Sequence, residues 1–289
     1  MKILVIGGTR FFGIHTVNQL LRDGHDVTIA TRGRTGDDFG DKIKRLTFDR
    51  YDEASIRQVL GGKYFDLVID KIAYCSNDIK KLLDIIDFGK FIYMSTTAIY
   101  ESKHLNMTES DFNPLTKKLV WCDRKDFPYD EVKRQAETAL WQKYSNRKFI
   151  AVRYPVVLGK DDYTKRLEFY IQHVMNDLPM NIDNLDAQMS FICSEEAGAF
   201  MAFLADKDFC GAVNGASSGT ISLREIIDYI EKKSGKKAII KKDGDSAPYN
   251  GEVSFSVKTE KAREIGFHFS DLHEWIFDLI DWYIANYSS

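Results

Sequence analysis

The sequence predicts an α/β protein with a doubly wound parallel sheet, helices on both faces and a smaller C-terminal lobe. Short apolar stretches that suit buried strands alternate with segments that have helical periodicity. The first of these stretches, residues 3–6, runs directly into a glycine-rich turn and then a helix. With 289 residues, of which 44% are hydrophobic, the chain can bury a core of this size.

The glycine-rich turn reads Gly-Gly-Thr-Arg-Phe-Phe-Gly at residues 7–13. Glycines let the backbone turn tightly and approach a pyrophosphate, whose charge then faces the N-terminus of the next helix. That helix is expected over residues 15–22, and a plain strand-to-helix connector is the alternative interpretation. The turn predicts a dinucleotide site that includes Gly7, Thr9, Arg10, Phe11, Phe12 and Gly13.

The second strand, expected at residues 26–30, is followed by Arg32 and Arg34. An acidic residue here would bind the adenosine ribose of NAD, whereas two guanidinium groups suit a 2′-phosphate. We therefore expect NADP as the cofactor, with NAD as second choice. Two solvated loop arginines are the alternative.

Further strands are expected at residues 46–48, 65–69, 91–94 and 149–152, with a helix at 54–60 between the third and fourth strands. Ligands of doubly wound sheets bind at the carboxyl ends of the strands. Asp49 and Arg50 follow the third strand and join the candidate cofactor residues. Ser95, Thr96 and Thr97 follow the fifth strand as a group of hydroxyls.

Residues 101–127 lack periodicity and predict a long functional loop, after which Pro128 suits the first turn of a helix that extends to residue 144. Later helices are expected at 166–175, 195–204, from the capping box at Ser222 to about Gly235, and at 272–283, whose apolar stripe indicates core packing. We expect a dinucleotide-binding domain over residues 1–158. Residues 159–289 then form mainly a substrate-binding lobe, with some segments that return to the core.

Tyr129 and Lys133 lie four residues apart and so share one helix face. The glycine turn, the hydroxyls after the fifth strand and this Tyr-x-x-x-Lys pair together resemble a short-chain dehydrogenase/reductase of the extended, atypical branch. Arg153-Tyr154-Pro155 and residues 213–217 extend the resemblance over most of the chain. It implies a Rossmann-like fold.

The resemblance also implies the roles of the site residues. Tyr129 is the acid/base, Thr96 binds the substrate oxygen with Ser95 and Thr97 as alternatives, and Lys133 holds the nicotinamide ribose. Pro155 joins the cofactor residues. A free phenol has a pKa of about 10, so we expect the ammonium of Lys133 to lower the pKa of Tyr129.

Three departures from the family pattern narrow the range of expected activities. Arg10 replaces the middle glycine of the usual motif, which matches a GGxxxxG subgroup, and its guanidinium can bind a phosphate. Thr97-Ala98 lacks the Asp-Glu of the dehydratases, which disfavours dehydration. Residues 189–196 lack the arginine and histidine usual in the sugar epimerases, so a nucleotide sugar is possible without being indicated.

The composition excludes several classes of protein. A net charge of −3 gives no general attraction to nucleic acid or to an anionic membrane. No apolar run is long enough for a signal peptide or a membrane span, so the cytoplasm is the expected location. The four cysteines, Cys75, Cys122, Cys193 and Cys210, are scattered, which predicts reduced packing thiols and no metal site.

The expected function is that of an NAD(P)-dependent oxidoreductase or epimerase acting on a hydroxyl or carbonyl compound, with a sugar or nucleotide-sugar derivative as the candidate substrate. The expected partner is this small molecule, for a monomer or homodimer. The alternative is a nucleotide-sensing or RNA-binding protein with vestigial catalytic residues. The intact Thr96, Tyr129 and Lys133 set favours the enzyme.

Overall fold

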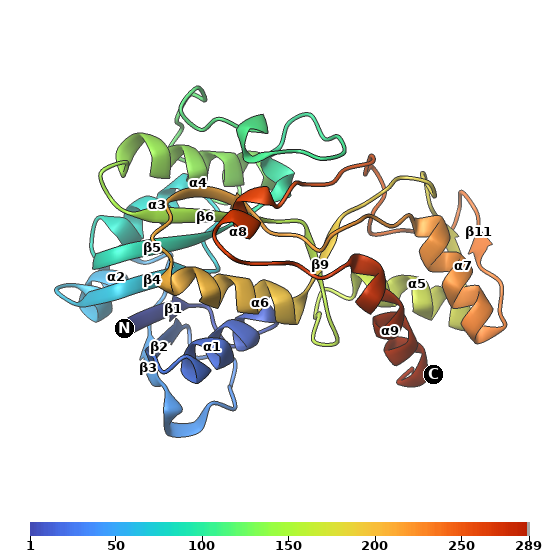
Figure 1. Ribbon diagram of the computed structural model, residues 1–289, viewed down its shortest axis with the longest axis horizontal. Coiled ribbons are helices and arrows are strands. Elements are labelled where there is room, and N and C mark those ends of the chain that lie inside the picture. The colour runs from blue at the N-terminus through green and yellow to red at the C-terminus, as the bar shows by residue number, and fades with distance from the viewer. Residues whose placement is uncertain (288–289) are drawn as a thin grey trace.

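A seven-stranded parallel sheet forms the centre of the computed structural model, which describes residues 1–287 (Figure 1). Its strands are β1 (Lys2–Ile6), β2 (Asp26–Thr31), β3 (Lys44–Thr47), β4 (Tyr64–Asp70), β5 (Asp87–Thr96), β6 (Phe149–Tyr154) and β10 (Gly211–Asn214). They lie in the order β10-β6-β5-β4-β1-β2-β3, so the chain reverses its direction across the sheet at β1 and β4. The predicted fold class is confirmed.

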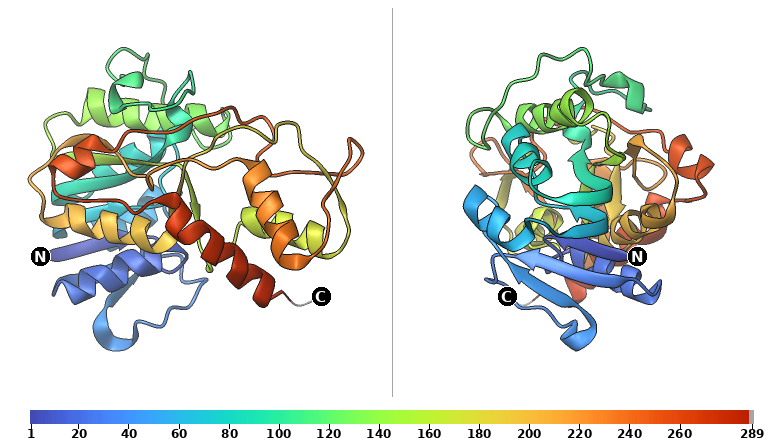
Figure 2. Two further views of the ribbon diagram at one scale, coloured as in Figure 1. Left: turned by 45° about the vertical axis from the view of Figure 1, so that its right-hand side comes forward. Right: turned by 90° about the vertical axis from the view of Figure 1, so that its left-hand side faces the viewer.

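Helices cover both faces of the sheet (Figures 1 and 2). One face carries α1 (Phe12–Arg22) and α6 (Ser194–Phe203), and the other carries α2 (Glu53–Leu60), α3 (Ser76–Leu83) and α4 (Tyr129–Lys143). Alternate residues of β1 enter the two cores: Ile3 and Val5 on the α1 side, Leu4 and Ile6 on the other. Burial on both faces explains why the central strands have uninterrupted apolar sequences.

The second lobe packs around α5 (Arg166–Met175), α7 (Leu223–Ser234) and α9 (Leu272–Ala285), seen at the right of Figure 1. The predicted capping box of α7 is present, with Ser222 and Glu225 bonded to each other's backbone amides. The apolar stripe of α9 is buried in the core of this lobe, as expected. The other elements are β7 (Val156–Leu158), β8 (Pro179–Asn181), β9 (Phe191–Cys193), β11 (Ile239–Ile240), β12 (Asp245–Ser246), α8 (Glu260–Glu264) and the 3₁₀ turns at Gly40–Lys42, Thr97–Ile99, Glu109–Asp111 and Leu204–Asp206.

Two segments far along the chain return to the main sheet. β10 pairs with the edge strand β6, and α6 packs against α1. The helices meet closely because α6 has Gly198 at the contact, where a Cβ would lie 2.8 Å from the Phe12 carbonyl oxygen and from the Thr16 amide nitrogen.

The structure corrects two expectations about the elements. The helix α3 was not predicted, although it buries Ile79, Leu82 and Leu83, because it is short and carries two lysines in its last turn. The strand β5 begins at Asp87, four residues before the expected start. Its first residues, Asp-Phe-Gly-Lys, alternate polar with buried positions and do not form an apolar run.

All four cysteines are free thiols, and Cys75 and Cys122 are buried beside each other. Burial raises the pKa of Cys75 to about 12, which keeps it protonated. Within residues 1–287 no helix is both long and apolar enough to cross a membrane.

A fully buried ion pair fixes the long loop before α4. The Arg153 guanidinium donates to the two carboxylate oxygens of Glu137 at 3.1 and 2.7 Å. It also donates to the Glu109 carbonyl oxygen at 2.7 Å, so one side chain joins β6, α4 and the loop. Both partners are 0% exposed, so each needs the other to offset its desolvation.

We expect Glu137→Ala to lower the free energy of unfolding by about 3–5 kcal/mol, because it leaves the Arg153 charge buried without its partner. Urea denaturation followed by circular dichroism measures this. The control is Glu53→Ala, which breaks the exposed pair of Glu53 with Arg57 and should cost under about 1 kcal/mol. Equal costs for the two variants would contradict the role given to Arg153.

Candidate active site

A cavity of about 440 Å³ lies at the carboxyl ends of β1, β2 and β4, where the strand order reverses. This is the position at which doubly wound sheets bind ligands. Eight of the predicted cofactor residues line the cavity: Gly7, Thr9, Arg10, Phe11, Phe12, Arg32, Arg34 and Arg50. The other four, Gly13, Asp49, Lys133 and Pro155, are not among its lining residues.

The glycine-rich turn takes its unusual backbone conformations at Gly7 and Phe11. Gly7 has φ 82°, which suits glycine, whereas Phe11 has φ 54° and ψ −146°, a conformation that is costly for a side chain. Arg10, at the position of the missing glycine, does not have a positive φ. Its guanidinium lies 5.8 Å from the Tyr163 ring centroid. The backbone at Arg10 therefore has no positive-φ strain.

The three arginines Arg10, Arg32 and Arg34 are exposed and line the cavity. Within residues 1–287, none of them donates a side-chain hydrogen bond or forms an ion pair. Each guanidinium is therefore available to an anionic ligand.

Arg50 is in a different situation, because its guanidinium is committed to the protein. It donates to both oxygens of Asp70 at 2.9 and 3.0 Å, and its Nε lies 3.5 Å from Asp78. The same Asp70 accepts the amides of Ile72 and Ala73. Arg50 therefore holds the segment after β4 in place and contributes to the cavity wall by packing.

Two other predicted cofactor residues have structural contacts of their own. The Asp49 carboxylate is exposed and accepts the Tyr51 amide at 3.0 Å, which closes a turn after β3. Gly13 is the second residue of α1, where an added Cβ would collide with the Lys71 Nζ atom.

The structure brings Thr96, Tyr129 and Lys133 together beside the cavity. Thr96 ends β5 and interacts with the Tyr129 side chain, which is the first residue of α4. One turn further on, Lys133 is 1% exposed, and its Nζ donates to the carbonyl oxygens of Ala73 and Met94 at 3.0 and 2.6 Å. Met94 is itself one of the residues that line the cavity.

The expectation that Lys133 lowers the pKa of Tyr129 is wrong. Desolvation raises the pKa of Tyr129 to about 12, although the residue as a whole is 48% exposed, and hydrogen bonding with Thr96 only partly offsets this. Desolvation also lowers the pKa of Lys133 to about 7. The loss of water around each group, which the sequence does not reveal, has a larger effect on both pKa values than the attraction between the two groups.

The lining residues that the sequence did not predict include Lys71, Tyr74, Arg124 and Tyr163. Tyr74 lies with its ring centroid 5.8 Å from that of Tyr129, and the Arg124 guanidinium lies 3.7 Å from the Tyr74 ring centroid. Lys71 directly follows β4, so the strand-end rule applied to Asp49 and Arg50 also identifies it. Arg124 and Tyr163 lie in irregular segments that give no such signal.

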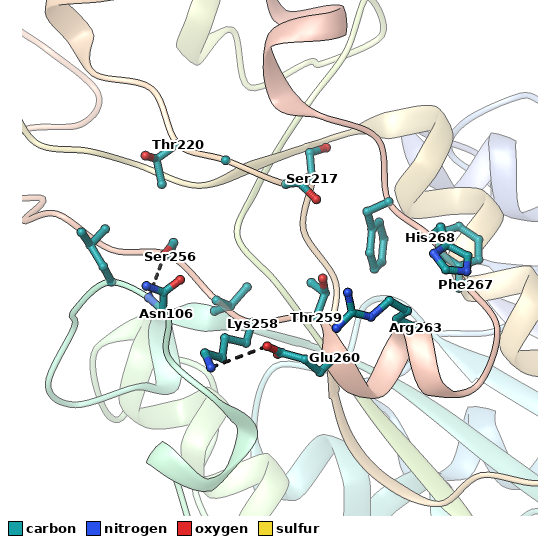
Figure 3. Close-up of a pocket in the computed structure, with 15 residues that line it drawn as sticks. Asn106, Ser217, Thr220, Ser256, Lys258, Thr259, Glu260, Arg263, Phe267 and His268 are labelled. Carbon is teal, nitrogen blue, oxygen red and sulfur yellow. Dashed lines mark hydrogen bonds and ion pairs between the residues drawn. The ribbon is translucent and has the colours of Figure 1, made fainter.

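A second cavity of about 480 Å³ lies near α8 and is separate from the predicted site residues (Figure 3). Figure 3 shows two contacts among its lining residues. Lys258 pairs with Glu260 at 3.6 Å, and the Asn106 amide donates to Ser256 at 2.7 Å. None of the predicted catalytic or cofactor residues lines it.

Comparison with known proteins agrees with this geometry. The model of the NAD dependent epimerase/dehydratase family matches residues 3–87, which span β1 to the start of β5. A chloroplast stem-loop binding protein of 41 kDa from Arabidopsis thaliana is 26% identical over 203 residues, covering 65% of this chain and 50% of that protein. A UDP-glucose 4-epimerase from Lactobacillus helveticus is 28% identical over 184 residues, covering 55% of this chain and 52% of that enzyme. The chain thus spans about half the length of the curated relatives that it matches.

Among solved structures, UDP-glucose 4-epimerase of Thermus thermophilus in complex with NAD superposes with a TM-score of 0.74 at 17% identity, over 99% of this chain and all of that one. The likeness shows a shared fold. The fold and the cavity at its switch point are those of the doubly wound α/β class, which binds ligands at the carboxyl ends of its strands. The matched model agrees with the resemblance seen in the sequence: residues 3–87 are similar to the NAD dependent epimerase/dehydratase family.

Proposed function

We propose that this protein is a nicotinamide-dinucleotide-dependent oxidoreductase or epimerase that acts on a hydroxyl-bearing or carbonyl carbon of a sugar derivative. One observation carries the proposal: a cavity with three unpaired arginines adjoins Thr96, Tyr129 and Lys133 at the same edge of the sheet. An anionic cofactor and an acid/base group are the two requirements of hydride-transfer chemistry at a carbinol.

The residues present fit a dinucleotide. The turn after β1 presents the N-terminus of α1, whose first residue has no side-chain cap. Free amides at such a terminus favour phosphate. Arg32 and Arg34 follow β2, the strand next to β1, and are placed to pair with a phosphate on the adenosine ribose. These contacts favour NADP over NAD.

The proposed chemistry assigns one task to each polar group beside the cavity. A bound nicotinamide would exchange a hydride, which is a proton with two electrons, with the substrate carbon. Tyr129 would pass a proton to or from the substrate oxygen, and Thr96 would hold that oxygen by a hydrogen bond. At neutral pH the Tyr129 phenol is protonated, because its pKa is about 12, so it begins as an acid.

Positive charge is needed when Tyr129 has to lose its proton. Arg124 and Arg166 already lower its pKa, although burial outweighs them. Arg166 begins α5 in the second lobe, so a substrate bound between the lobes would exclude water around these charges and strengthen their effect. Lys133, anchored on two carbonyl oxygens, would hold the nicotinamide ribose.

A second candidate function is binding of stem-loop RNA, which is favoured by the name of the relative from Arabidopsis thaliana. The net charge of −3 counts against it, because most nucleic-acid binding relies on phosphate neutralisation by a basic surface. A failed substrate screen together with tight, salt-dependent binding of a stem-loop would favour this second function.

We expect Tyr129→Phe to lower turnover about 10²- to 10⁴-fold while leaving NADPH affinity unchanged, because only the proton donor is lost. Lys133→Met should lower both turnover and affinity. The assay begins with a screen of carbonyl compounds and nucleotide sugars, followed by NADPH absorbance or, for epimerisation, by product stereochemistry. The control is Tyr64→Phe, an exposed tyrosine at the start of β4. Full activity in Tyr129→Phe would refute its assignment.

The two arginines after β2 generate a cofactor prediction. Calorimetry should show tighter binding of NADPH than of NADH. The double variant Arg32→Ala with Arg34→Ala should lose this preference and keep the affinity for NADH, because only the contacts with the 2′-phosphate disappear. Equal affinities in the unaltered protein would overturn the choice of NADP.

Arg10 gives a separate prediction about the phosphates. Arg10→Gly should weaken NADPH binding by about 1.5–3 kcal/mol, the contribution of a hydrogen bond to a charged group. The exposed Arg22 at the other end of α1 provides the matched control, Arg22→Gly. If the two variants bind NADPH equally well, Arg10 has no contact with the cofactor.

A further inference from the structure

Lys71 is a buried cation that the proposed chemistry does not use. The residue is 6% exposed, lines the cavity and follows the central strand β4. Its Nζ atom lies 3.8 Å from the centroid of the Phe12 ring and beside Gly13, at the first turn of α1. Within residues 1–287 this ammonium donates no hydrogen bond and forms no ion pair, unlike the buried Lys133, Arg50 and Arg153.

The face of the Phe12 ring attracts the ammonium, but the other surroundings of Lys71 are unfavourable for a cation. The N-terminus of a helix carries partial positive charge, so α1 repels the ammonium that lies against its first turn. Arg10 and Arg124 line the same cavity and add charge of the same sign. The one anion that acts on Lys71 is Asp161, which is already bonded to His15 at 3.1 Å and to Ser194 at 2.8 Å.

Burial lowers the pKa of Lys71 to about 7, so about half of the molecules hold a neutral amine at neutral pH. The polar groups that influence it are Asp161, which raises its pKa, and His15, whose own pKa Lys71 lowers. The missing element is an anion with an oxygen free to accept from Nζ. The N-terminus of α1 provides donors for the same anion.

We propose that Lys71 binds the pyrophosphate of the dinucleotide from the side of the Phe12 ring, and that the cofactor binds together with a proton that Lys71 takes up. This inference rests on the proposed function, because it deepens the description of the same cofactor site. Lys71, which lies outside the glycine-rich turn, then balances the charge of the phosphates. Its protonation makes the affinity for the dinucleotide dependent on pH.

The sign of the effect follows from linkage. Below about pH 7 the free protein already carries the charged lysine, so binding needs no proton and affinity is constant. Above that pH the amine must be protonated on binding, so affinity falls by up to tenfold per pH unit until the pH reaches the raised pKa of the complex.

The test is calorimetric titration with NADPH at about pH 8, where the 2′-phosphate is fully ionised, in two buffers with different heats of ionisation. The difference between the binding heats measured in the two buffers gives the number of protons taken up on binding. Lys133 has a similar pKa and could contribute, so the comparison of variants is decisive. We expect Lys71→Met to take up nearly one proton fewer than the unaltered protein, and to bind NADPH about 10- to 100-fold more weakly at about pH 6.5.

The matched control is Lys63→Met, the same substitution just before the exposed start of β4, which should change neither quantity. Lys71→Gln provides a second neutral variant, and circular dichroism verifies that each protein is folded. Equal proton uptake in Lys71→Met and the unaltered protein would overturn this inference while leaving the proposed function intact. Failure of the unaltered protein to bind any dinucleotide would overturn both.

Discussion

Loss of water around charged side chains is the constraint on which this site depends. Four of the cations buried near the carboxyl edge of the sheet show how the cost of desolvation is met. Arg153 pairs with Glu137, Arg50 with Asp70, and Lys133 with two backbone carbonyl oxygens. Lys71 alone among these four has no oxygen acceptor within residues 1–287, and it lies instead over the face of the Phe12 ring.

Sequence periodicity and turn chemistry predicted most of the fold and the location of the cavity. The glycine turn, the capping box at Ser222 and the stripe on α9 depend on residues close together in the chain, so local rules identify them. The pKa values of Tyr129 and Lys133 depend on which distant segments exclude water from them. The structural role of Arg50 could not be predicted for the same reason, since its partners Asp70 and Asp78 lie 20 and 28 residues away in the sequence. Only the folded chain reveals such contacts.

The evidence for function is unevenly distributed along the chain. The family model covers residues 3–87, the part that forms the cavity around the glycine turn. The second lobe has a core of its own in α5, α7 and α9, but its sequence lacks the arginine and histidine that sugar epimerases usually have. The cofactor site is therefore better defined than the substrate site, and substrate identity depends on residues such as Arg166 at the border of that lobe.

The return of β10 and α6 to the main sheet has a consequence for biosynthesis. Residues of α1 such as Phe12 and Val17 share a core with Phe200 and Met201 of α6, which a ribosome adds more than 180 positions later. Until then the nascent chain presents an uncovered apolar face and an open sheet edge at β6, both of which favour aggregation. The sheet therefore reaches its full width only after residue 214 has left the exit tunnel.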